Sequence, residues 1–467
     1  MRIFKMFLAI LAGKAAIYIS RILGNQGTNF AGKIARRIYP RILTNLAENI
    51  DGPTIIVTGT NGKTTTTNMI AEIIKQNNSS YVHNRAGANM INGITTAFIE
   101  KADLLGTKHF DYALLETDEA NVPLLLKELK VDYILITNFF RDQLDRYGEL
   151  DHTINLIKDA VKDTYIELVL NADDPLMVHF QNQTGLKCWY YGFEDTRYDT
   201  AEGTASREGR FCVLCGQELN YSRYHYAQLG NFECPQCHSH NPGMHFSGSG
   251  LDMSPTINMK VNDLEIKSPY QGFYNAYNVL AAVAFSSIMG ISSDVIQSAM
   301  ASFKPRAGRM ETFVINGKKT ILILVKNPTG LNQSLSMLAS DTTEKNLFIA
   351  LNDNAADGRD ISWIWDADVE PVTEAAAVIK QIVCSGQRSG DIAVRIKHTG
   401  FDPQRIIIKT PLQEGIETVV YGESKITYIL STYTALFQCR KILVKMQKKN
   451  RVAIETGQQQ QKKAEGE

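Results

Sequence analysis

The chain has 467 residues, of which 44% are hydrophobic and 21% charged, with 49 basic and 49 acidic side chains. A chain of this length normally folds into about three domains, and this composition is that of a globular protein with a large core. The balanced charge gives no electrostatic reason to expect a nucleic-acid partner, because binding to a phosphate backbone normally requires a basic face.

Residues 1–50 are predicted to be helical, with apolar and basic residues mixed. The uninterrupted apolar run, Met6–Gly13, is far shorter than the roughly 20 residues of a membrane-spanning helix. A signal peptide is disfavoured, because Lys14 and Arg21 interrupt the apolar stretch and no convincing cleavage site follows. We expect an amphipathic helix that packs on the next domain, with peripheral contact to a membrane surface as the alternative.

From Thr54 onward, strand patterns alternate with helical patterns. Such alternation indicates an α/β fold with a doubly wound, mostly parallel sheet. Each predicted strand ends in polar residues, and the functional site of such a sheet lies beyond the carboxyl ends of its strands. The predicted strands are TIIVTGT (54–60), YALLET (112–117), YILITN (133–138) and ELVLNADD (167–174).

A segment rich in Gly, Ser, Tyr, His and Cys interrupts this pattern from about Asp195 to Gly250. A predicted helix, YNAYNVLAAVAFSSIMG (274–290), then precedes an expected linker near KPRAGRME (304–311). A second α/β unit is predicted from the strand patterns TILILV (320–325), NLFIAL (346–351) and AAVIKQIVCSG (376–386). The expected organisation is a helical segment (1–50), a central domain (51–308), a smaller C-terminal α/β domain (309–450) and a disordered polar tail (451–467).

The stretch VTGTNGKTTT (57–66) lies at a predicted strand-to-helix junction. In this setting the backbone N–H groups and the helix N-terminus hold a polyphosphate, Lys63 adds positive charge, and Thr64 can bind Mg²⁺. Only two residues separate Gly59 from Gly62, whereas the usual P-loop has four before its Gly-Lys-Thr. A degenerate P-loop, a different nucleotide loop and a turn that only caps a helix are therefore all open.

Acidic residues follow two of the predicted strands. One acidic strand end usually indicates a solvated loop, but two in a sheet that also carries the lysine loop favour a Mg²⁺ site. Glu116 is the best candidate for a metal ligand. The segment LLETDEA supplies Glu116, Asp118 and Glu119, and TNFFRDQLDRYGE supplies Asn138, Asp142 and Asp145.

Six motifs in this order resemble those of the Mur ligases and their folylpolyglutamate synthetase relatives. The resemblance implies ATP-dependent activation of a carboxylate as an acyl phosphate, which an amine then attacks. Such phosphoryl transfer requires mainly positioning and charge neutralisation, which suits these residues. The motifs are TGTNGKTTT, LLETDEA, TNFFRDQLDRYGE, LNADDP, YNAYNVLAA and AGRMETF.

The resemblance also implies roles for individual residues. Catalytic roles fall to Lys63 and Glu116, and Mg²⁺ is expected at Thr64 and Glu116. Nucleotide contacts are expected from Thr60, Asn61, Gly62, Lys63, Thr64, Thr65, Asn275 and Asn278, and from Arg309, which would reach the phosphates from the linker.

The sequence departs from the family pattern at three places. Gln143 stands where many Mur ligases have His, and no equivalent of the modified lysine of some members is evident. The segment ILVKNP replaces the family's DYAHNP, with Ile323 in place of the acid and Lys326 in place of His. Nucleotide contacts from the C-terminal domain are therefore not expected to follow the family.

Four of the seven cysteines are spaced Cys-x₂-Cys-x₁₈-Cys-x₂-Cys. Two such pairs in a Gly- and Tyr-rich segment are typical of the knuckles of a zinc ribbon, placed here at about 205–245. The alternatives are disulfides, which a cytosolic ATP enzyme should not hold, and a redox dithiol, which does not explain two pairs. Four thiolates leave no open position for a substrate, so the Zn²⁺ is expected to be structural. Its predicted ligands are Cys212, Cys215, Cys234 and Cys237; His238 and His240 are expected at the surface, and Cys188, Cys384 and Cys439 are expected to be buried or inert.

A zinc-ribbon insertion is not general among amino-acid-adding Mur ligases, but it fits one branch, the MurT synthetase subunits. The segments LNDNAADGRDISWIWDAD (351–368) and YTALFQCR (433–440) also look like this branch. The resemblance implies that the activated group is the D-glutamate α-carboxylate of lipid II, amidated to D-isoglutamine with ammonia in peptidoglycan biosynthesis. It implies a GatD-like glutaminase as partner in a heterodimer, and a cytoplasmic location, with the inner face of the membrane as an option.

The segment NDNAADGRD (352–360) carries Asp353, Asp357 and Asp360 after a predicted strand. An Asx-rich turn with a helix cap is one explanation. The resemblance implies another, in which Asp360 has a catalytic role by orienting the His of the partner's Cys–His pair. Trp363 and Trp365 would suit such an interface.

Three further considerations bear on the reaction. A glutaminase needs a nucleophilic Cys on a sharp turn, and none of the three cysteines outside the predicted zinc site has that setting. One competing hypothesis is an amino-acid-adding ligase of the Mur or folylpolyglutamate type, against which the zinc ribbon and NDNAADGRD count. Another is a non-catalytic zinc-ribbon binding module, against which zero net charge and the intact set of Lys63, Thr64 and Glu116 count.

Overall fold

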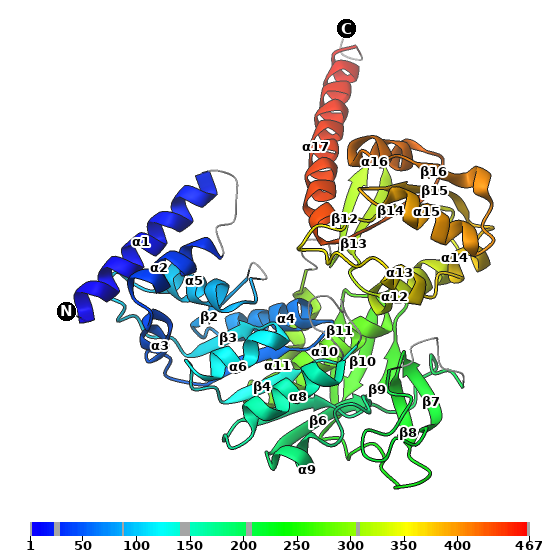
Figure 1. Cartoon of the computed structure of the whole chain (residues 1–467). Helices are drawn as coiled ribbons and strands as arrows, with labels where there is room; N and C mark the ends of the chain where they lie inside the picture. Colours follow the sequence, from blue (N-terminus) through cyan, green and yellow to red (C-terminus); the bar gives the residue numbers. More distant parts are fainter. Residues whose placement is uncertain are drawn as a thin grey trace. The chain divides into compact units, whose positions relative to one another are not determined.

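The structure is a computed structural model that describes residues 2–22, 29–85, 88–140, 150–201, 208–304 and 309–464. The side chains of Arg2, Arg309 and residues 451–464 are not described. These residues form two compact units, one ending at Phe303 and the other beginning at Lys304 (Figure 1).

The first unit is built on a nine-stranded sheet in the order β11-β10-β9-β6-β5-β4-β1-β3-β2. Neighbouring strands from β2 to β9 are parallel, and β10 is antiparallel to both β9 and β11. The predicted doubly wound, mostly parallel sheet is confirmed. Its strands are β1 (Thr54–Thr58), β2 (Tyr81–His83), β3 (Tyr112–Glu116), β4 (Tyr133–Ile136), β5 (Glu167–Asn171), β6 (Cys188–Phe193), β9 (Phe246–Asp252), β10 (Ile257–Val261) and β11 (Leu264–Ser268).

Helices cover both faces of this sheet. Side chains alternate along β1, so Ile56 joins one core while Ile55 and Val57 join the other. All five residues of β1 are buried, as expected of a strand covered on both faces. The helices are α1 (Arg2–Ile22), α2 (Phe30–Ile38), α3 (Ile42–Ala47), α4 (Lys63–Gln76), α5 (Ile91–Lys101), α6 (Val122–Leu126), α8 (Leu150–Val161), α9 (Phe180–Thr184), α10 (Phe273–Ile288) and α11 (Ser293–Ser302), with a 3₁₀ turn η1 (Glu119–Asn121).

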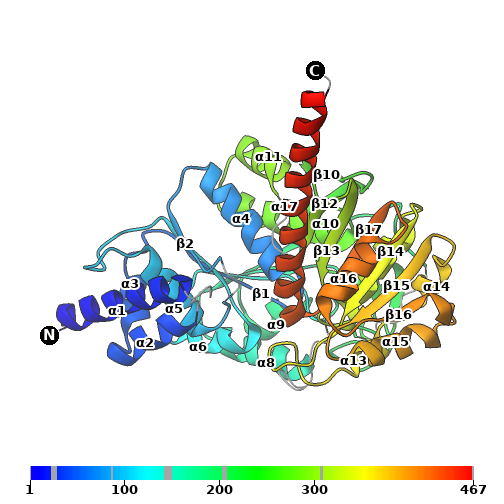
Figure 2. The same cartoon turned by 90° about the horizontal axis from the view of Figure 1, so that it is seen from above.

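The N-terminal helix α1 packs on α2 and α5, as the sequence predicts (Figure 2). The segment Ile3–Ile22 is nevertheless long and apolar enough, by length and composition alone, to cross a membrane. The expectation that it is too short was therefore wrong. The helix continues through Lys14, so its average hydropathy stays high although its uninterrupted apolar run is short.

A small hairpin of β7 (Asn220–Tyr226) and β8 (Leu229–Glu233) lies between β6 and β9 in the chain. Its strands are antiparallel and belong to neither large sheet. It lies within the segment in which the sequence predicts a zinc ribbon.

The second unit has a six-stranded sheet in the order β12-β13-β17-β14-β15-β16. Only β12 is antiparallel to its neighbour, and apolar cores cover both faces. The strands are β12 (Arg309–Ile315), β13 (Lys318–Leu324), β14 (Lys345–Ala350), β15 (Ile379–Ser385), β16 (Ile406–Ile408) and β17 (Ile426–Ser431). The helices are α12 (Pro328–Ser340), α13 (Trp363–Asp366), α14 (Pro371–Glu374), α15 (Ser389–His398), α16 (Leu412–Tyr421) and α17 (Tyr433–Ala464), with a 3₁₀ turn η2 (Pro403–Arg405).

Helix α17 includes residues 451–464, most of the segment predicted to be a disordered tail. Gln, Lys, Ala and Glu dominate this segment, and all four are good helix formers. In Figure 1 this end of α17 extends beyond the six-stranded sheet of its unit.

Candidate nucleotide and zinc sites

The loop between β1 and α4 requires glycine at two positions. Gly59 and Gly62 adopt φ angles of +117° and +86°, which side chains with a Cβ rarely adopt. A Cβ on Gly62 would lie 2.1 Å from Oδ1 of Asn278, which α10 places against the loop. The loop therefore brings its backbone close to α10 and leaves the first N–H groups of α4 at its rim, where an anion can bind.

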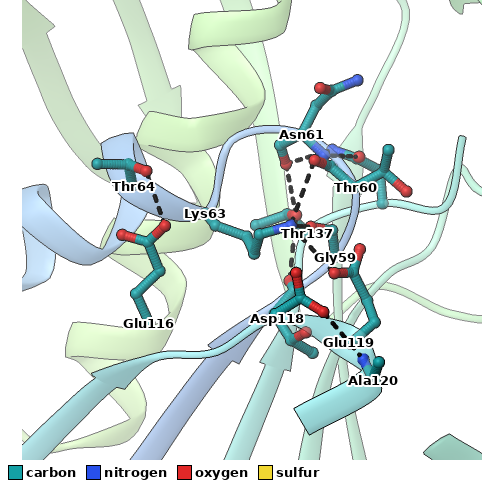
Figure 3. Close-up of polar contacts among 12 residues, drawn as sticks. Gly59, Thr60, Asn61, Lys63, Thr64, Glu116, Asp118, Glu119, Ala120 and Thr137 are labelled. Carbon is teal, nitrogen blue, oxygen red and sulfur yellow. Dashed lines mark hydrogen bonds and ion pairs between the residues drawn. The ribbon is translucent and has the colours of Figure 1, made fainter. Parts of the chain in front are cut away.

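The Lys63 side chain is buried beside this loop (Figure 3). Its Nζ donates to the carbonyl oxygen of Gly59 and lies 3.1 Å from Oε2 of Glu119. This ion pair holds the Lys63 ammonium group beneath the loop. From this position the ammonium group can reach a phosphate bound at the loop. Glu119, which the sequence grouped with candidate metal ligands, contacts the lysine instead.

Thr64 and Glu116 come together as the sequence predicts. Thr64 Oγ1 donates to Oε1 of Glu116 at 2.8 Å, although 52 residues separate the two in the chain (Figure 3). Parallel pairing of β1 with β3 accounts for this, because it places Val57 beside Glu116 at the same edge of the sheet. A hydroxyl and a carboxylate in contact are oxygen ligands suited to Mg²⁺.

Asn84, directly after β2, holds the backbone of Glu116 in place. Its Nδ2 donates to the Glu116 carbonyl at 2.7 Å, and the Glu116 N–H donates to its Oδ1 at 2.9 Å. Sequence reasoning missed this residue. The available signal was an amide side chain at the end of a short strand.

Residues at the end of β4 hold the loop between β1 and α4 in place. Asn138 Oδ1 accepts from the N–H of Asn61 at 2.9 Å, and Thr137 Oγ1 donates to the Asn61 carbonyl at 2.6 Å. Thr60 Oγ1 donates to the carbonyl of Phe140 at 3.0 Å. Both ends of the Asn138 side chain are thus bonded to Asn61, and its inclusion in a metal site stays a prediction. Gln143, Asp142 and Asp145 lie outside the described residues.

Helix α10 supplies the two predicted asparagines. Asn278 Oδ1 accepts from Thr66 Oγ1 at 3.3 Å, and Asn275 Oδ1 accepts from Asn278 Nδ2 at 3.3 Å. The Thr65 hydroxyl is buried and has no hydrogen-bond partner among the described residues. The loop formed by Gly59 and Gly62, the buried ammonium group of Lys63 and the Thr65 hydroxyl together fit a polyphosphate. The other predicted contact, Arg309, begins β12 in the second unit, and its side chain is not described.

Two buried carboxylates lie behind the loop. Burial raises the pKa of Asp173 and of Asp174 to about 6. Asp173 Oδ2 accepts from Tyr277 Oη and from the N–H of Phe193, each at 2.8 Å. Asp174 Oδ2 accepts from the N–H of Phe139 at 3.1 Å.

A glutamine of the small hairpin contacts Asp174 and the backbone after β4. Gln228 Nε2 donates to the carbonyl of Phe139 at 2.6 Å and to Oδ1 of Asp174 at 3.3 Å. Because the next residue, Phe140, is bonded to Thr60, the hairpin is connected to the loop between β1 and α4 through two successive residues, Phe139 and Phe140. The sequence contained no signal for this link.

The four predicted zinc ligands converge at the hairpin. Their sulfur atoms lie within 4.8 Å of one another, with Cys212 to Cys237 and Cys215 to Cys234 at 3.5 Å. A tetrahedral zinc with Zn–S bonds of about 2.3 Å would separate its sulfurs by about 3.8 Å. Backbone N–H groups of Cys237 and Gln236 donate to the Cys234 sulfur and lower its pKa to about 6. The four thiols fit Zn²⁺.

The two histidines next to the cysteine cluster and the three other cysteines lie as predicted. His238 and His240 are exposed. Burial raises the pKa of Cys188, Cys384 and Cys439 to about 12, so none of the three is poised as a nucleophile.

The three aspartates after β14 have different surroundings. Asp353 pairs with Arg388 at 2.7 Å, and Asp357 is buried and accepts from the N–H of Thr434 at the start of α17 at 2.7 Å. Asp360 is half-buried, and its Oδ1 accepts from the N–H of Ser362 at 2.8 Å. The contact of Asp360 with Ser362 is therefore that of an Asx-turn, and the contact of Asp357 with Thr434 is that of a helix cap.

The two tryptophans after this segment differ in exposure. Trp363 is buried, whereas Trp365 is half-exposed and lies against His398 and the guanidinium of Arg395. Only Trp365 offers a large surface for contact with another molecule.

Comparison with known proteins gives two family matches. A Mur ligase middle domain model matches residues 57–286, and a MurT ligase C-terminal model matches residues 324–436. The "Lipid II isoglutaminyl synthase (glutamine-hydrolyzing) subunit MurT" of Staphylococcus aureus (strain COL) is 36% identical over 92% of this chain and 95% of its own length. The protein of the same name from Streptococcus pneumoniae (strain ATCC BAA-255 / R6) is 35% identical over 95% of this chain and 98% of its own length.

Solved structures share the fold. A pseudomurein peptide ligase type C from Methanothermus fervidus has a TM-score of 0.63 and 21% identity, covering 86% of this chain and 80% of that one. A MurF ligase from Thermotoga maritima in complex with ADP has a TM-score of 0.60 and 14% identity, covering 89% of this chain and 84% of that one.

Proposed function

Because this chain belongs to the MurT family of Mur ligases, we propose that it is the synthetase subunit of a lipid II isoglutaminyl synthase. The reaction is ATP-dependent amidation of the D-glutamate α-carboxylate of lipid II, which gives D-isoglutamine. The γ-phosphate passes to a carboxylate oxygen, and ammonia displaces phosphate from the resulting acyl phosphate.

The observation that carries this proposal is the arrangement of Lys63, Thr64 and Glu116 at the N-terminus of α4. The lysine lies under the glycine loop, and the threonine hydroxyl contacts the carboxylate at 2.8 Å. These residue types suit a nucleotide triphosphate and a divalent cation, and the fold brings them together at one edge of the sheet. Preorganised groups of this kind need little rearrangement during phosphoryl transfer.

Each of these residues has a definable task. Lys63 exchanges its Glu119 carboxylate for phosphate oxygens, so positive charge faces the transferred group. Thr64 and Glu116 would hold Mg²⁺, which when bound neutralises phosphate charge. Asn84 positions Glu116, and Thr60, Asn61 and Gly62 direct the loop N–H groups to the phosphates. Thr65, Asn275 and Asn278 line the nucleotide side, and Arg309 is assigned to the phosphates by family resemblance.

The ammonia comes from a separate glutaminase subunit in this proposal. Burial and the high pKa of Cys188, Cys384 and Cys439 support this, because the remaining four cysteines form the proposed zinc site. Asp360 is assigned to the partner's active site, where its carboxylate would orient the catalytic His. The half-exposed Trp365 supports a contact surface on the same segment.

Zn²⁺ at Cys212, Cys215, Cys234 and Cys237 is proposed to be structural. Four cysteine ligands complete a tetrahedron and leave no position for a substrate. The metal would fix the hairpin that carries Gln228, and with it the carbonyl of Phe139 behind the nucleotide loop.

The test uses the purified full chain with Mg·ATP, lipid II and either ammonium or an amino acid. We expect ATP hydrolysis coupled to amidated lipid II with ammonium alone, detected by a mass decrease of about one unit relative to the acid. Lys63→Ala should abolish it. Turnover with an amino acid and none with ammonium would instead identify an amino-acid-adding ligase.

A further inference from the structure

Helix α1 has an exposed face that is apolar along its whole length. Exposed residues recur at spacings of three and four, so they form one stripe on a helix about 30 Å long. Their exposed fractions run from 38% at Leu8 to 68% at Tyr18. The stripe consists of Phe4, Leu8, Leu11, Ala15, Tyr18 and Ile22, and Ile3 and Ile19 flank it with more than half of each side chain exposed.

The opposite face of α1 is already used by the protein. Ala9, Ile10, Ala16 and Ile17 are buried in the first core, and α1 contacts α2 and α5. In Figure 1, α2 and α5 lie between α1 and the sheet of the first unit, with α1 on the outside. An ordinary surface helix has a polar outer face. Here the outer face is apolar, so the need to pack against this unit does not explain it.

The charge of the same region is one-sided. Residues 1–47 contain eight basic and no acidic residues, so the rest of the chain carries 41 basic against all 49 acidic residues. The N-terminal segment is therefore basic although the net charge of the whole chain is zero. Lys5, Lys33 and Arg37 are exposed on α1 and α2. The basic residues are Arg2, Lys5, Lys14, Arg21, Lys33, Arg36, Arg37 and Arg41.

We propose that α1 docks on an anionic phospholipid bilayer, lying along its surface with the apolar stripe among the headgroups and upper acyl chains. Glu100 of α5 pairs with Arg21, and Glu128 pairs with Arg36, but the N-terminal segment itself has no acidic residue and Lys5, Lys33 and Arg37 are exposed beside the stripe. An exposed apolar stripe with exposed basic neighbours matches that surface both in hydrophobicity and in charge. A position across the bilayer is disfavoured. It would separate Ala9, Ile10, Ala16 and Ile17 from their core and place Lys14 near the middle of the hydrocarbon.

The docked helix would hold the nucleotide domain at the surface where a lipid-linked substrate lies; this consequence, unlike the docking, rests on the proposed function. Docking itself requires neither ATP nor lipid II. It can therefore be tested separately from the reaction.

The test is flotation of the full-length protein with vesicles. We expect the protein to float with vesicles of phosphatidylcholine and phosphatidylglycerol, to bind at least about tenfold less to phosphatidylcholine alone or in high salt, and to be released by alkaline carbonate. Leu8→Asp/Tyr18→Asp should reduce binding about a hundredfold, because each large apolar side chain removed from an interface costs about a factor of ten.

The matched control is Tyr165→Asp, the same substitution at a fully exposed tyrosine in the same unit but outside the stripe. It should bind vesicles like the wild type. Lys33→Ser/Arg37→Ser should weaken binding to anionic vesicles only, and unchanged nucleotide affinity would show that each variant is folded. The proposal is overturned if the wild type fails to float, if carbonate does not release it, or if the Leu8/Tyr18 variant binds as the wild type does.

Discussion

Replacing Asn84 by alanine tests how the metal site is held. The substitution removes both hydrogen bonds from the Asn84 side chain to the backbone of Glu116, at 2.7 and 2.9 Å. Each buried backbone group left without a partner costs about 1–3 kcal/mol, so the free energy of unfolding should fall by about 3 kcal/mol if water replaces part of the loss. The freed Glu116 should also bind Mg²⁺ less well, and loss of a residue that positions a metal ligand typically costs about 10–100-fold in affinity.

Two measurements separate these effects. Urea unfolding gives the change in stability, and ATP turnover at varied Mg²⁺ gives the change in apparent metal affinity. The matched control is Asn241→Ala, because the Asn241 side chain also accepts from one backbone N–H, that of Phe232, and donates to backbone carbonyls, those of Ala172 and Gly230. We expect this control to lose comparable stability and keep the wild-type Mg²⁺ dependence. If Asn84→Ala also keeps that dependence, Asn84 does not position Glu116 for metal binding.

Three further predictions follow from the geometry. Gly62→Ala should abolish binding of a fluorescent ATP analogue while circular dichroism shows that the protein stays folded. The reason is that the new Cβ would lie 2.1 Å from Oδ1 of Asn278, at a φ of +86°. Retained affinity for the analogue would contradict the role of this loop in phosphate binding. Cys234→Ser should lose the roughly one equivalent of zinc measured by atomic absorption and weaken ATP binding, and a zinc content equal to that of the wild type would contradict the assignment. Since burial raises the pKa of Asp173 to about 6, the folded state binds its proton more tightly than the unfolded state, so this carboxyl should contribute a loss of stability of about 2 kcal/mol between pH 4 and pH 6, and Asp174 a similar one. Asp173→Asn should reduce the change of unfolding free energy with pH, and an unchanged pH dependence would refute the contribution of Asp173.

The local motifs were sufficient to identify the chemical groups of the site. Lys63 and Thr64 follow a strand and begin a helix, and this order alone places a cation and a hydroxyl at a helix N-terminus. The cysteine spacing likewise predicted a four-thiolate cluster, because two Cys-x-x-Cys turns need only one hairpin to meet. Such features depend on residues that are close in sequence, so periodicity and spacing reveal them.

Only the tertiary structure decided which distant residues support these groups. Asn84 reaches Glu116 across 32 residues, Glu119 pairs with Lys63 across 56, and Gln228 reaches Phe139 across 89. Asn138, whose side chain also suits a metal, is bonded to the loop at Asn61. Strand order and helix packing determine these contacts, and neither leaves a local pattern in the sequence. For the same reason, the apolar residues of α1 could be divided into a buried face and an exposed one only after α2 and α5 were in place.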